Sequence, residues 1–442
     1  MQTALSPPGE LLAPFSAFAF ERRTAVVAAV SGGSDSTALL LLLKRHIDRF
    51  ARPVRLIAVT VDHGLRPEAA GEARAVGRLA AKLGVEHRIL RWTGPKPETG
   101  VSAAAREARY RLLAQAAEEA GTDIVVTAHT ADDQAETVSM RRRRGDGMGL
   151  AGMAPATLFD GKVWIARPLL ETRRETLRDF LTASAVGWFD DPSNVDPRSE
   201  RARVRAELSS GERADDAFRD LLELAKRSAG QRIDVGRRAA SLVTALAREV
   251  EPGLILLDRS LLTAEDGVAA AFALRVLLAV SGGAALLPDE QRTQSLLEKL
   301  GKPPCRATLS RALIASRRDG IWVAREQRSL PTPQAVYDGM IWDGRFRLSG
   351  PRSGSATIAA VGAGNARRTA AGDGLPGQLA RAARAAQPAQ EGTDGWQAAP
   401  VAGPYARFLS AFDLDMARAV SSLVGGSAIP DPPCAGHNVG RA

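Results

Sequence analysis

Two short polar segments of the chain carry the residue types that could perform chemistry on phosphates. The first, 31–36, reads Ser-Gly-Gly-Ser-Asp-Ser, and the second, 128–137, contains one histidine and three acidic residues. Glycines at a helix start let backbone N–H groups approach an anion closely. Clustered carboxylates can hold Mg²⁺ beside bound phosphates, or grip a substrate ammonium group. The two segments therefore indicate phosphate chemistry with a metal ion or an amine as a further ligand.

The glycine segment lies between an apolar stretch at 24–30 and a helical pattern at 36–50. Such a strand-to-helix turn builds an anion hole from N–H groups. It is not a Walker A loop, because the lysine of that motif is absent. The alternative is an ordinary turn that binds no ligand. We predict such a turn for the similar Ser-Gly-Gly at 281–283. The predicted phosphate-binding residues are Ser31, Gly32, Gly33, Ser34, Asp35 and Ser36.

The acidic segment marks another strand end followed by a helix start. Asp133 and Glu136 are three residues apart, so both can face one ligand on a helix. Capping of the helix is the alternative, since acids are common near helix N-termini. Capping explains one acid well, but it explains three acids beside His129 poorly. We therefore predict that Asp132, Asp133 and Glu136 contribute to a ligand site.

Arginines accompany these segments. Arg106 and Arg109 share a helical pattern and could offset charge on a transferring phosphoryl group, with a surface helix as the alternative. The four arginines at 141–144 lie beside glycines and suit contact with a phosphate backbone, although such a run is more often a solvated face. A further basic strip comprises Arg198, Arg201, Arg203 and Arg205.

The pattern of the first half indicates how these residues would meet. Alternating apolar and amphipathic stretches predict an α/β fold with a doubly wound parallel sheet. The strands are expected at 24–30, 54–61, 85–92 and 123–127, and the helices between them at 36–50, 68–83 and 102–120. Ligands bind such sheets at the carboxyl ends of the strands. The glycine segment, the Asp-His-Gly at 62–64 and His129 all fall at such ends.

The second half of the chain has a different pattern. Helical stretches at 200–208, 214–228, 234–246 and 268–279 precede short strand-like pieces at 307–315, 320–324 and 345–348. We expect a catalytic domain over 20–208, a helical domain over 209–300 and a smaller mixed C-terminal accessory region over 301–442. Within the last, 352–400 is rich in Gly, Ala, Arg and Ser, and we expect it to be flexible.

Composition limits the class of protein. The 442 residues carry a net charge of +9, which favours a polyanionic partner, although a generally basic proteome is the alternative. The two cysteines, Cys305 and Cys434, cannot form a disulfide framework or a zinc site. We see no secretion signal, and the longest apolar window, 268–287, is interrupted by Arg275. We therefore expect a cytoplasmic protein without a membrane span.

Taken together, these motifs resemble the tRNA(Ile)-lysidine synthase family, a branch of the PP-loop ATP pyrophosphatases. They occur in the order of the family and cover 20–208, with a looser likeness at 325–326 and 342–346. The matching segments are 31–36, 61–66, 105–110, 128–137, 145–153, 167–170, 191–194 and 201–205.

The resemblance implies a C–N ligase that uses ATP and Mg²⁺. In this family ATP adenylates the C2 oxygen of the wobble cytidine of tRNA(Ile), which releases pyrophosphate. The ε-amine of free lysine then displaces AMP. The residues implied in catalysis are Asp35, His129, Asp132, Asp133 and Arg106, with Asp35 and Asp132 on the metal. The residues implied to contact lysine or tRNA are Asp133, Glu136, Arg109, Arg142, Arg143, Arg203 and Arg205.

The implied partners are tRNA(Ile) with a wobble cytidine and free L-lysine, and the helical domain would bind the tRNA. A homodimer, the order of substrate binding and the tRNA elements that are read stay open. One alternative is a PP-loop enzyme of tRNA thiolation, but such enzymes generally need cysteines near the site, and none precedes Cys305. Another is a non-catalytic tRNA-binding protein on a PP-loop scaffold. The intact Asp35, His129, Asp132 and Asp133 argue against that.

Overall fold

The structure is a computed structural model that describes residues 9–50, 53–64, 69–94, 96–145, 147–191, 196–209, 214–351, 356–366, 375–391 and 395–434. The chain forms two compact units. The N-terminal unit comprises Met1–Arg232 with Asp431–Ala442, and the C-terminal unit comprises Ile233–Pro430. The finer division that we expect, with boundaries at 208 and 300, stays a prediction.

The N-terminal unit alternates strands and helices over most of its length, as predicted. Its strands are β1 (Ala25–Ala29), β2 (Arg55–Asp62), β3 (Glu86–Arg91), β4 (Ile124–Val126), β5 (Ala156–Phe159) and β6 (Val163–Ala166). Its helices are α1 (Gly9–Leu12), α2 (Ser34–Phe50), α3 (Ala69–Lys82), α4 (Val101–Glu119), α5 (Ala131–Arg142), α6 (Arg174–Ala183) and α7 (Glu200–Leu208). The long helix α8 (Ala214–Leu246) follows and replaces the two helices expected at 214–228 and 234–246.

The sheet of this unit reverses its strand order at β1, which confirms the doubly wound prediction. Its described strands follow the order β5-β6-β4-β1-β2-β3. Within β1, Val27 pairs with Ile57 of β2 on one side and with Val125 of β4 on the other, both in parallel. Only β5 departs from the parallel arrangement, since it pairs with β6 antiparallel. The loops that leave β1 and β4 therefore diverge and open a crevice at their carboxyl ends.

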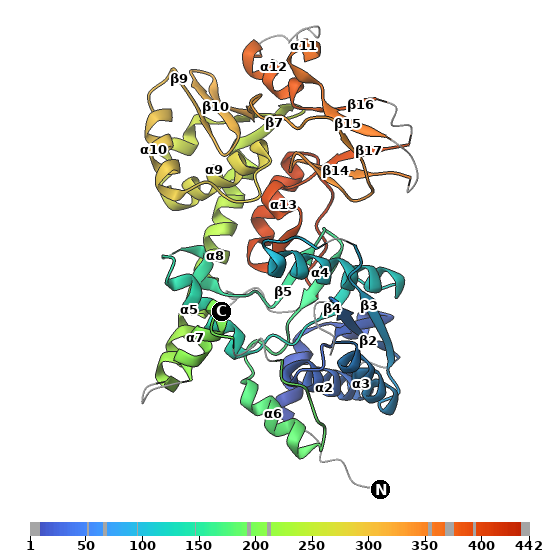
Figure 1. Ribbon diagram of the computed structural model, residues 1–442. Coiled ribbons are helices and arrows are strands. Elements are labelled where there is room, and N and C mark those ends of the chain that lie inside the picture. Colours follow the sequence, from blue (N-terminus) through green and yellow to red (C-terminus); the bar gives the residue numbers. More distant parts are fainter. Residues whose placement is uncertain are drawn as a thin grey trace. The chain divides into compact units, whose positions relative to one another are not determined.

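Apolar packing on both faces holds the sheet in place. Figure 1 shows α4 across the sheet from α2 and α3. Helix α4 places the buried side chains Tyr110 and Leu113 against Val27, Ile57 and Val125. Full burial of one such aliphatic side chain contributes about 1.5–3 kcal/mol. Strands buried on both faces read as continuous apolar runs, which is why the sequence locates them well.

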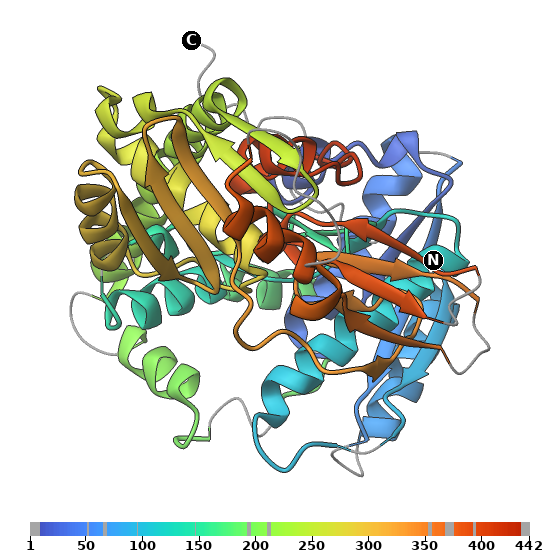
Figure 2. The same cartoon turned by 90° about the horizontal axis from the view of Figure 1, so that it is seen from above.

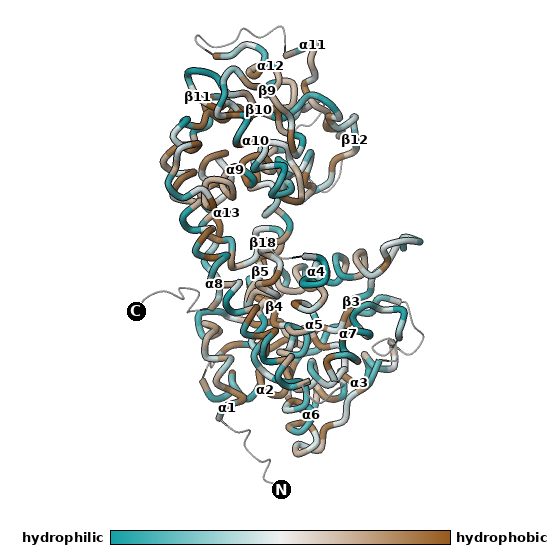
Figure 3. The backbone as a smooth tube through the Cα atoms, turned by 90° about the vertical axis from the view of Figure 1, so that its left-hand side faces the viewer, coloured by the Kyte–Doolittle hydropathy of each residue, from teal (hydrophilic) through white to brown (hydrophobic). Residues whose placement is uncertain are grey.

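The C-terminal unit is built around an antiparallel sheet with the order β7-β8-β11-β10-β9. Figure 2 shows β9–β11 side by side, in golden brown, next to α10. Helices cover both faces: α12 contacts β11 and β8, while the apolar α9, mostly brown in Figure 3, contacts β11 and β10. These elements are β7 (Ala247–Glu251), β8 (Leu254–Leu257), α9 (Gly267–Gly282), α10 (Glu290–Leu300), β9 (Cys305–Leu309), β10 (Ala312–Arg317), β11 (Gly320–Arg325) and α12 (Gly377–Ala385).

Strands β7 and β8 differ from the expectation of a purely helical region at 209–300. The strand β7 reads Ala-Arg-Glu-Val-Glu and carries little β-strand signal, but its pairing with β8 satisfies its backbone groups. The turn expected at 281–283 is only partly correct, because Ser281 and Gly282 lie in the last turn of α9 and only Gly283, with a left-handed φ of 64°, ends the helix. In the described parts of the chain, none of the helices combines the length and apolar character of a membrane span.

The remaining elements of this unit form two small sheets, β12-β15-β16 and β13-β14-β17. The described parts of 352–400 therefore differ from the expected flexible span. The reason is burial, since Ile358 and Trp396 pack with Trp342 in one apolar cluster. These elements are β12 (Gln334–Ala335), β13 (Ile341–Trp342), β14 (Phe346–Ser349), β15 (Thr357–Ala360), α11 (Gly362–Ala366), β16 (Pro388–Glu391), β17 (Gln397–Pro400), β18 (Phe408–Ser410) and α13 (Leu414–Leu423).

Candidate active site

A cavity of about 1490 Å³ lies at the carboxyl ends of the central strands of the N-terminal unit. Its walls include the loops that follow β1, β2 and β4, so the strand reversal and the cavity coincide. The volume exceeds the ~300–1000 Å³ of a usual small-molecule pocket. Most predicted site residues line it: Ser31, Gly33, Ser34, Asp35, Ser36, Arg109, His129, Asp132, Asp133, Glu136 and Arg205.

We call the glycine segment 31–36 the glycine loop. Hydrogen bonds of its own hydroxyls and contacts with a second segment of the chain fix its shape. The Ser36 hydroxyl accepts a hydrogen bond from the Ser31 amide and donates one to the Gly33 carbonyl, each at 3.1 Å. Gly32 has a φ of 91°, which only glycine adopts readily, and an added Cβ would lie 3.3 Å from the ring of Phe189. The Phe189 amide also donates to the Gly32 carbonyl at 2.9 Å. This loop geometry leaves room for an anion at the start of α2.

The loop after β4 positions the acids of α5 through a capping box. The Asp133 carboxylate accepts a hydrogen bond from the Thr130 amide at 2.9 Å, and the Thr130 hydroxyl accepts one from the Asp133 amide at 3.3 Å. The capping interpretation of the acidic segment therefore holds for Asp133, while its part in a ligand site stays a prediction. One carboxylate oxygen caps the helix, and the other faces the cavity side of the network described next.

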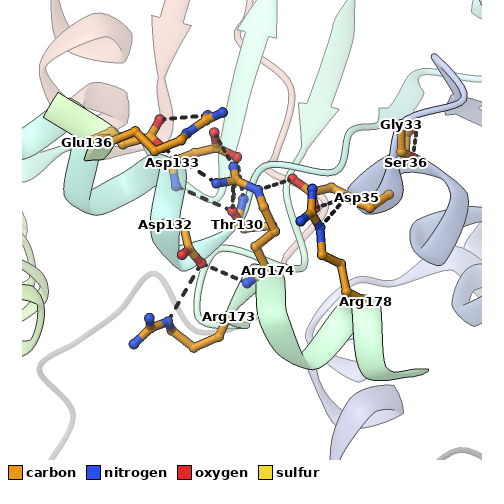
Figure 4. A network of polar contacts seen from close by, with 12 residues as sticks. Gly33, Asp35, Ser36, Thr130, Asp132, Asp133, Glu136, Arg173, Arg174 and Arg178 are labelled. Carbon is orange, nitrogen blue, oxygen red and sulfur yellow. Dashed lines mark hydrogen bonds and ion pairs between the residues drawn. The ribbon is translucent and has the colours of Figure 1, made fainter. Parts of the chain in front are cut away.

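Arg174, which we did not predict from the sequence, lies at the centre of the site (Figure 4). Its Nε donates to Asp35 at 2.9 Å and its Nη2 to Asp133 at 3.0 Å, while its Nη1 lies 3.5 Å from Glu136. Its backbone amide donates to Asp132 at 2.7 Å. We call the three acids that contact this guanidinium, Asp35, Asp133 and Glu136, the carboxylate cage.

Glu136 is the most enclosed member of the cage, with only 2% of its surface exposed. Two arginines of α7 hold it: Nε of Arg201 and Nε of Arg205 each donate to a carboxylate oxygen at 2.7 Å. Arg205, expected to contact tRNA or lysine, therefore lies in the cage wall. Arg201 belongs to the predicted basic strip, but no local pattern indicates its carboxylate partner.

Two further arginines from the start of α6 flank the cage. Arg173 lies 3.8 Å from the Asp132 carboxylate, and its guanidinium stacks 3.8 Å above the ring of Phe218. Arg178 contacts the Ser34 hydroxyl at 3.4 Å and the Asp190 carboxylate at 2.8 Å. Basic residues at a helix N-terminus oppose the helix dipole. That unfavourable placement of Arg173 and Arg174 is the one local signal that could have indicated a functional role.

His129 forms the floor of the site behind the cage. Its Nδ1 lies 3.0 Å from the Thr127 hydroxyl. Burial, followed by the nearby charge of Arg167, lowers the pKa of His129 to about 3, against the opposing effect of Asp133. The imidazole is therefore neutral at physiological pH and exchanges hydrogen bonds without adding charge.

The carboxylates of Asp35 and Asp133 respond differently to the same arginine. Burial raises the pKa of Asp35 above its ordinary value, even though Arg174 opposes this effect. Burial also acts to raise the pKa of Asp133, but the charges of Arg174 and Arg201 and the hydrogen bond from the Thr130 amide outweigh it, and the pKa is lowered. Asp35 therefore binds a proton more readily than Asp133 does, although both contact the same guanidinium.

The donor set fits Mg²⁺ only in combination with phosphates. In the described residues no group of three or more His, Cys, Asp or Glu side chains is arranged to hold a metal ion. Mg²⁺ in nucleotide sites commonly uses one or two carboxylates and completes its shell with phosphate and water oxygens. Asp35 and Asp132, the predicted ligands, both line the cavity and can supply such oxygens.

The predicted pair Arg106 and Arg109 divides between two environments. Arg109 lines the cavity, with its guanidinium 3.4 Å from Nε2 of His63 at the end of β2. Arg106 is exposed and stacks 4.9 Å above the ring of Tyr110. Asp62 also lines the cavity, and its carboxylate accepts hydrogen bonds from Gly64 and Arg91. Residues 65–68 and 192–195, which belong to two of the quoted motifs, lie outside the described residues.

Three predicted arginines lie outside the cavity lining. Arg142 and Arg143 line a separate surface hollow of about 380 Å³, and Arg143 pairs with Glu207. Arg203 is exposed and donates to the Pro197 carbonyl at 2.8 Å. Their exposure is compatible with contact to a large polyanion, and equally with a solvated charged face.

Comparisons with known proteins agree with this geometry. Residues 10–211 match the family model of the PP-loop domain. The tRNA(Ile)-lysidine synthase of Mesorhizobium japonicum is 50% identical over 433 residues, which cover 93% of this chain and 95% of that protein. The tRNA(Ile)-lysidine synthase of Brucella melitensis is 42% identical over 354 residues, which cover 77% of this chain and 78% of that protein.

Proposed function

Because this chain belongs to the tRNA(Ile)-lysidine synthase family, we propose a division of labour among its residues for ATP-dependent lysidine formation. The observation that carries the proposal is the meeting of the glycine loop and the acids of α5 in one cavity at the strand reversal. The loop offers an anion site, and the acids offer a cation site. ATP and an amine therefore have complementary places in the same cavity.

In the first step, the cytidine C2 oxygen attacks the α-phosphorus of ATP, and the bond to the pyrophosphate oxygen breaks. Ser31–Ser36 would hold the departing pyrophosphate through backbone N–H groups and hydroxyls. Arg109 and Arg106 would offset the charge that develops at the phosphate or on the activated base. Mg²⁺, held by Asp35 and Asp132, would neutralise phosphate charge when bound. Neutral His129 would support ATP through hydrogen bonding.

In the second step, the ε-amine of lysine attacks C2, and the C2–O bond breaks so that AMP leaves. We propose that Asp133 and Glu136 receive the lysine ammonium and guide its deprotonation before attack. The support is their shared orientation: both contact one cationic group, Arg174, in the structure. Adenylation makes AMP a good leaving group, so the protein contributes mainly positioning and charge stabilisation.

The tRNA would reach the cavity along arginines outside it, namely Arg142, Arg143 and Arg203, with Arg205 at the boundary. We place the reaction in the cytoplasm, where tRNA and ATP are available. The residues named for both steps come from one chain, so the proposal does not call on a second copy, and a homodimer stays a prediction. Thiolation has no support at the site, since neither Cys305 nor Cys434 lines the cavity.

The test is incubation of the protein with total tRNA, ATP and radiolabelled lysine. We expect label in tRNA(Ile) alone, with equal amounts of AMP and pyrophosphate that depend on that tRNA. A matched incubation with tRNA(Ile) whose wobble cytidine is replaced by uridine should give neither label nor AMP. Binding of tRNA without AMP formation would favour the non-catalytic alternative and contradict the proposal.

A further inference from the structure

The cation site proposed for lysine already contains a cation that belongs to the protein. The Arg174 side chain is only 16% exposed, and its guanidinium contacts all three carboxylates of the cage (Figure 4). Asp35 comes from the glycine loop, whereas Asp133 and Glu136 come from α5. Arg174 therefore bridges the part of the cavity assigned to ATP and the part assigned to lysine.

Arg174 and two further arginines together balance the charges of the cage. The three cage carboxylates face three arginines, since Arg201 and Arg205 also hold Glu136. A lysine ammonium added to this set would leave a buried positive charge without a partner. Such a charge is strongly unfavourable in a site removed from water. Lysine can therefore enter the cage favourably only if another cation leaves it.

The geometry identifies which cation can leave. Asp133 keeps its bond to the Thr130 amide, and Glu136 keeps Arg201 and Arg205, so neither acid loses all its partners when Arg174 moves. The Arg174 amide is anchored on Asp132, which fixes the backbone while the long side chain stays free to turn. A guanidinium also binds phosphate oxygens through paired hydrogen bonds, so the phosphates of ATP compete directly for it.

We propose that Arg174 is a resident cation that keeps the lysine subsite closed until the phosphates of ATP draw its guanidinium away from Asp133 and Glu136. This inference rests on the proposed function of the same cavity. Arg174 is then a positioning residue that couples the two subsites. By linkage, ATP raises the affinity for lysine and lysine raises the affinity for ATP by the same factor.

The first test uses the unmodified full-length protein and measures lysine binding by calorimetry. The probe for the ATP subsite is an analogue with a methylene bridge between its α- and β-phosphates, which binds but cannot release pyrophosphate. We expect lysine to bind at least about tenfold more tightly with the analogue than without it. Equal affinities in the two conditions would overturn the inference.

The second test removes the resident cation. In Arg174→Gln, lysine should bind without the analogue, and the coupling should fall to about one, while kcat for AMP formation also falls. Arg174→Lys keeps a positive charge at this position, so lysine should again bind only weakly in the absence of the analogue. The matched control is Arg88→Gln on β3, whose partners Glu86 and Glu119 lie outside the cavity lining, and it should keep the coupling of the unmodified protein.

The outcomes separate the two proposals. Thermal unfolding of each variant verifies that it is folded, and the measurement on the unmodified protein stands without any variant. Lysine that enters tRNA(Ile) and binds without coupling would overturn the role of Arg174 alone. Lysine that neither binds in any state nor enters tRNA(Ile) would contradict the proposed function and this inference with it.

Discussion

Each unit of the molecule encloses a group of ion pairs, and the two groups have opposite compositions. In the N-terminal unit, one arginine is surrounded by the three acids of the carboxylate cage. In the C-terminal unit, one acid, Asp343, is surrounded by Arg311, Arg325 and Arg345. We call the latter group the Asp343 cluster.

The groups differ in what satisfies their excess charge. In the Asp343 cluster, Arg325 is fully buried and donates to the Ser329 carbonyl at 3.1 Å, while Arg311 donates to the Gly283 carbonyl at 3.0 Å. Backbone oxygens thus complete the hydrogen bonding of the cluster, and burial lowers the pKa of Arg345 to about 10. The carboxylate cage instead borders a large cavity. The comparison teaches that a group completed by its own backbone holds a fold together, whereas one that borders open space has capacity for ligands.

The largest effect should follow removal of a cage carboxylate. Asp35→Ala should reduce AMP formation by at least ~10³-fold, because the carboxylate proposed to hold Mg²⁺ at the phosphates is lost. Binding of tRNA, measured by filter retention, should survive, because Asp35 faces the cavity. Full AMP formation in this variant would show that the carboxylate cage, like the Asp343 cluster, has only a structural role.

Removal of the central acid of the other group should instead affect stability. Asp343→Ala leaves the buried guanidinium groups of Arg325 and Arg345, and the partly exposed one of Arg311, without their carboxylate, which costs about 3–5 kcal/mol. Hydrogen exchange of the β10 and β11 amides would detect this loss as faster opening. The matched control is Glu290→Ala, which removes an exposed partner of Arg275 in the same unit and should cost about 1 kcal/mol or less. A loss no larger than that of the control would show that the cluster does not hold the unit together.

Acidification should destabilise the protein through His129, the neutral histidine beside the carboxylate cage. The pKa of His129 is about 3 in the folded chain and near its usual 6.5 when unfolded, so the unfolded state binds more protons between these values. Above pH 6.5 His129 is neutral in both states and does not change the stability. Below pH 6.5 the free energy of unfolding falls as the pH drops toward 3. At pH 5 the deficit should reach up to about 2 kcal/mol. Urea unfolding of His129→Gln should show a smaller loss between pH 7 and pH 5 than the unmodified protein, and an identical loss would contradict the burial argument.

The smallest effect is expected from arginines that belong to neither group. Changing Arg142 and Arg143 to Ala together should weaken tRNA binding about tenfold and reduce the slope of log affinity against log salt by about one to two. Lysine binding should not change, because neither residue lines the cavity. An unchanged salt slope would return both residues to the solvated-face interpretation.

The sequence predicted those parts of the fold and site whose signals are local. Strands β1, β2 and β4 are continuous apolar runs, and the loops that follow them carry the glycines and acids of the site. The parallel order of the sheet follows from the strand–helix alternation. These local signals were sufficient to place Asp35, His129 and Asp133 at one edge of a sheet.

The sequence could not predict contacts between distant residues. Arg174 and Asp35 lie 139 positions apart, and no periodicity or motif links them. The two helices expected at 214–228 and 234–246 form one helix, α8, which contains Gly230 because the modest cost of a helical glycine is tolerated there. In the C-terminal unit, the burial of Trp396 depends on strands from separate parts of the chain, which is why the composition of 352–400 suggested a linker.

The contacts between Phe189 and Gly32 have a consequence for the synthesis of the enzyme on the ribosome. The ribosome releases the glycine loop early, yet the amide and ring that support Gly32 emerge only with Phe189. A nascent chain that ends between these two positions contains the glycine loop but lacks Phe189. A chain that ends before residue 174 lacks Arg174 as well. The supported form of the loop therefore becomes available only once most of the N-terminal unit has been synthesised.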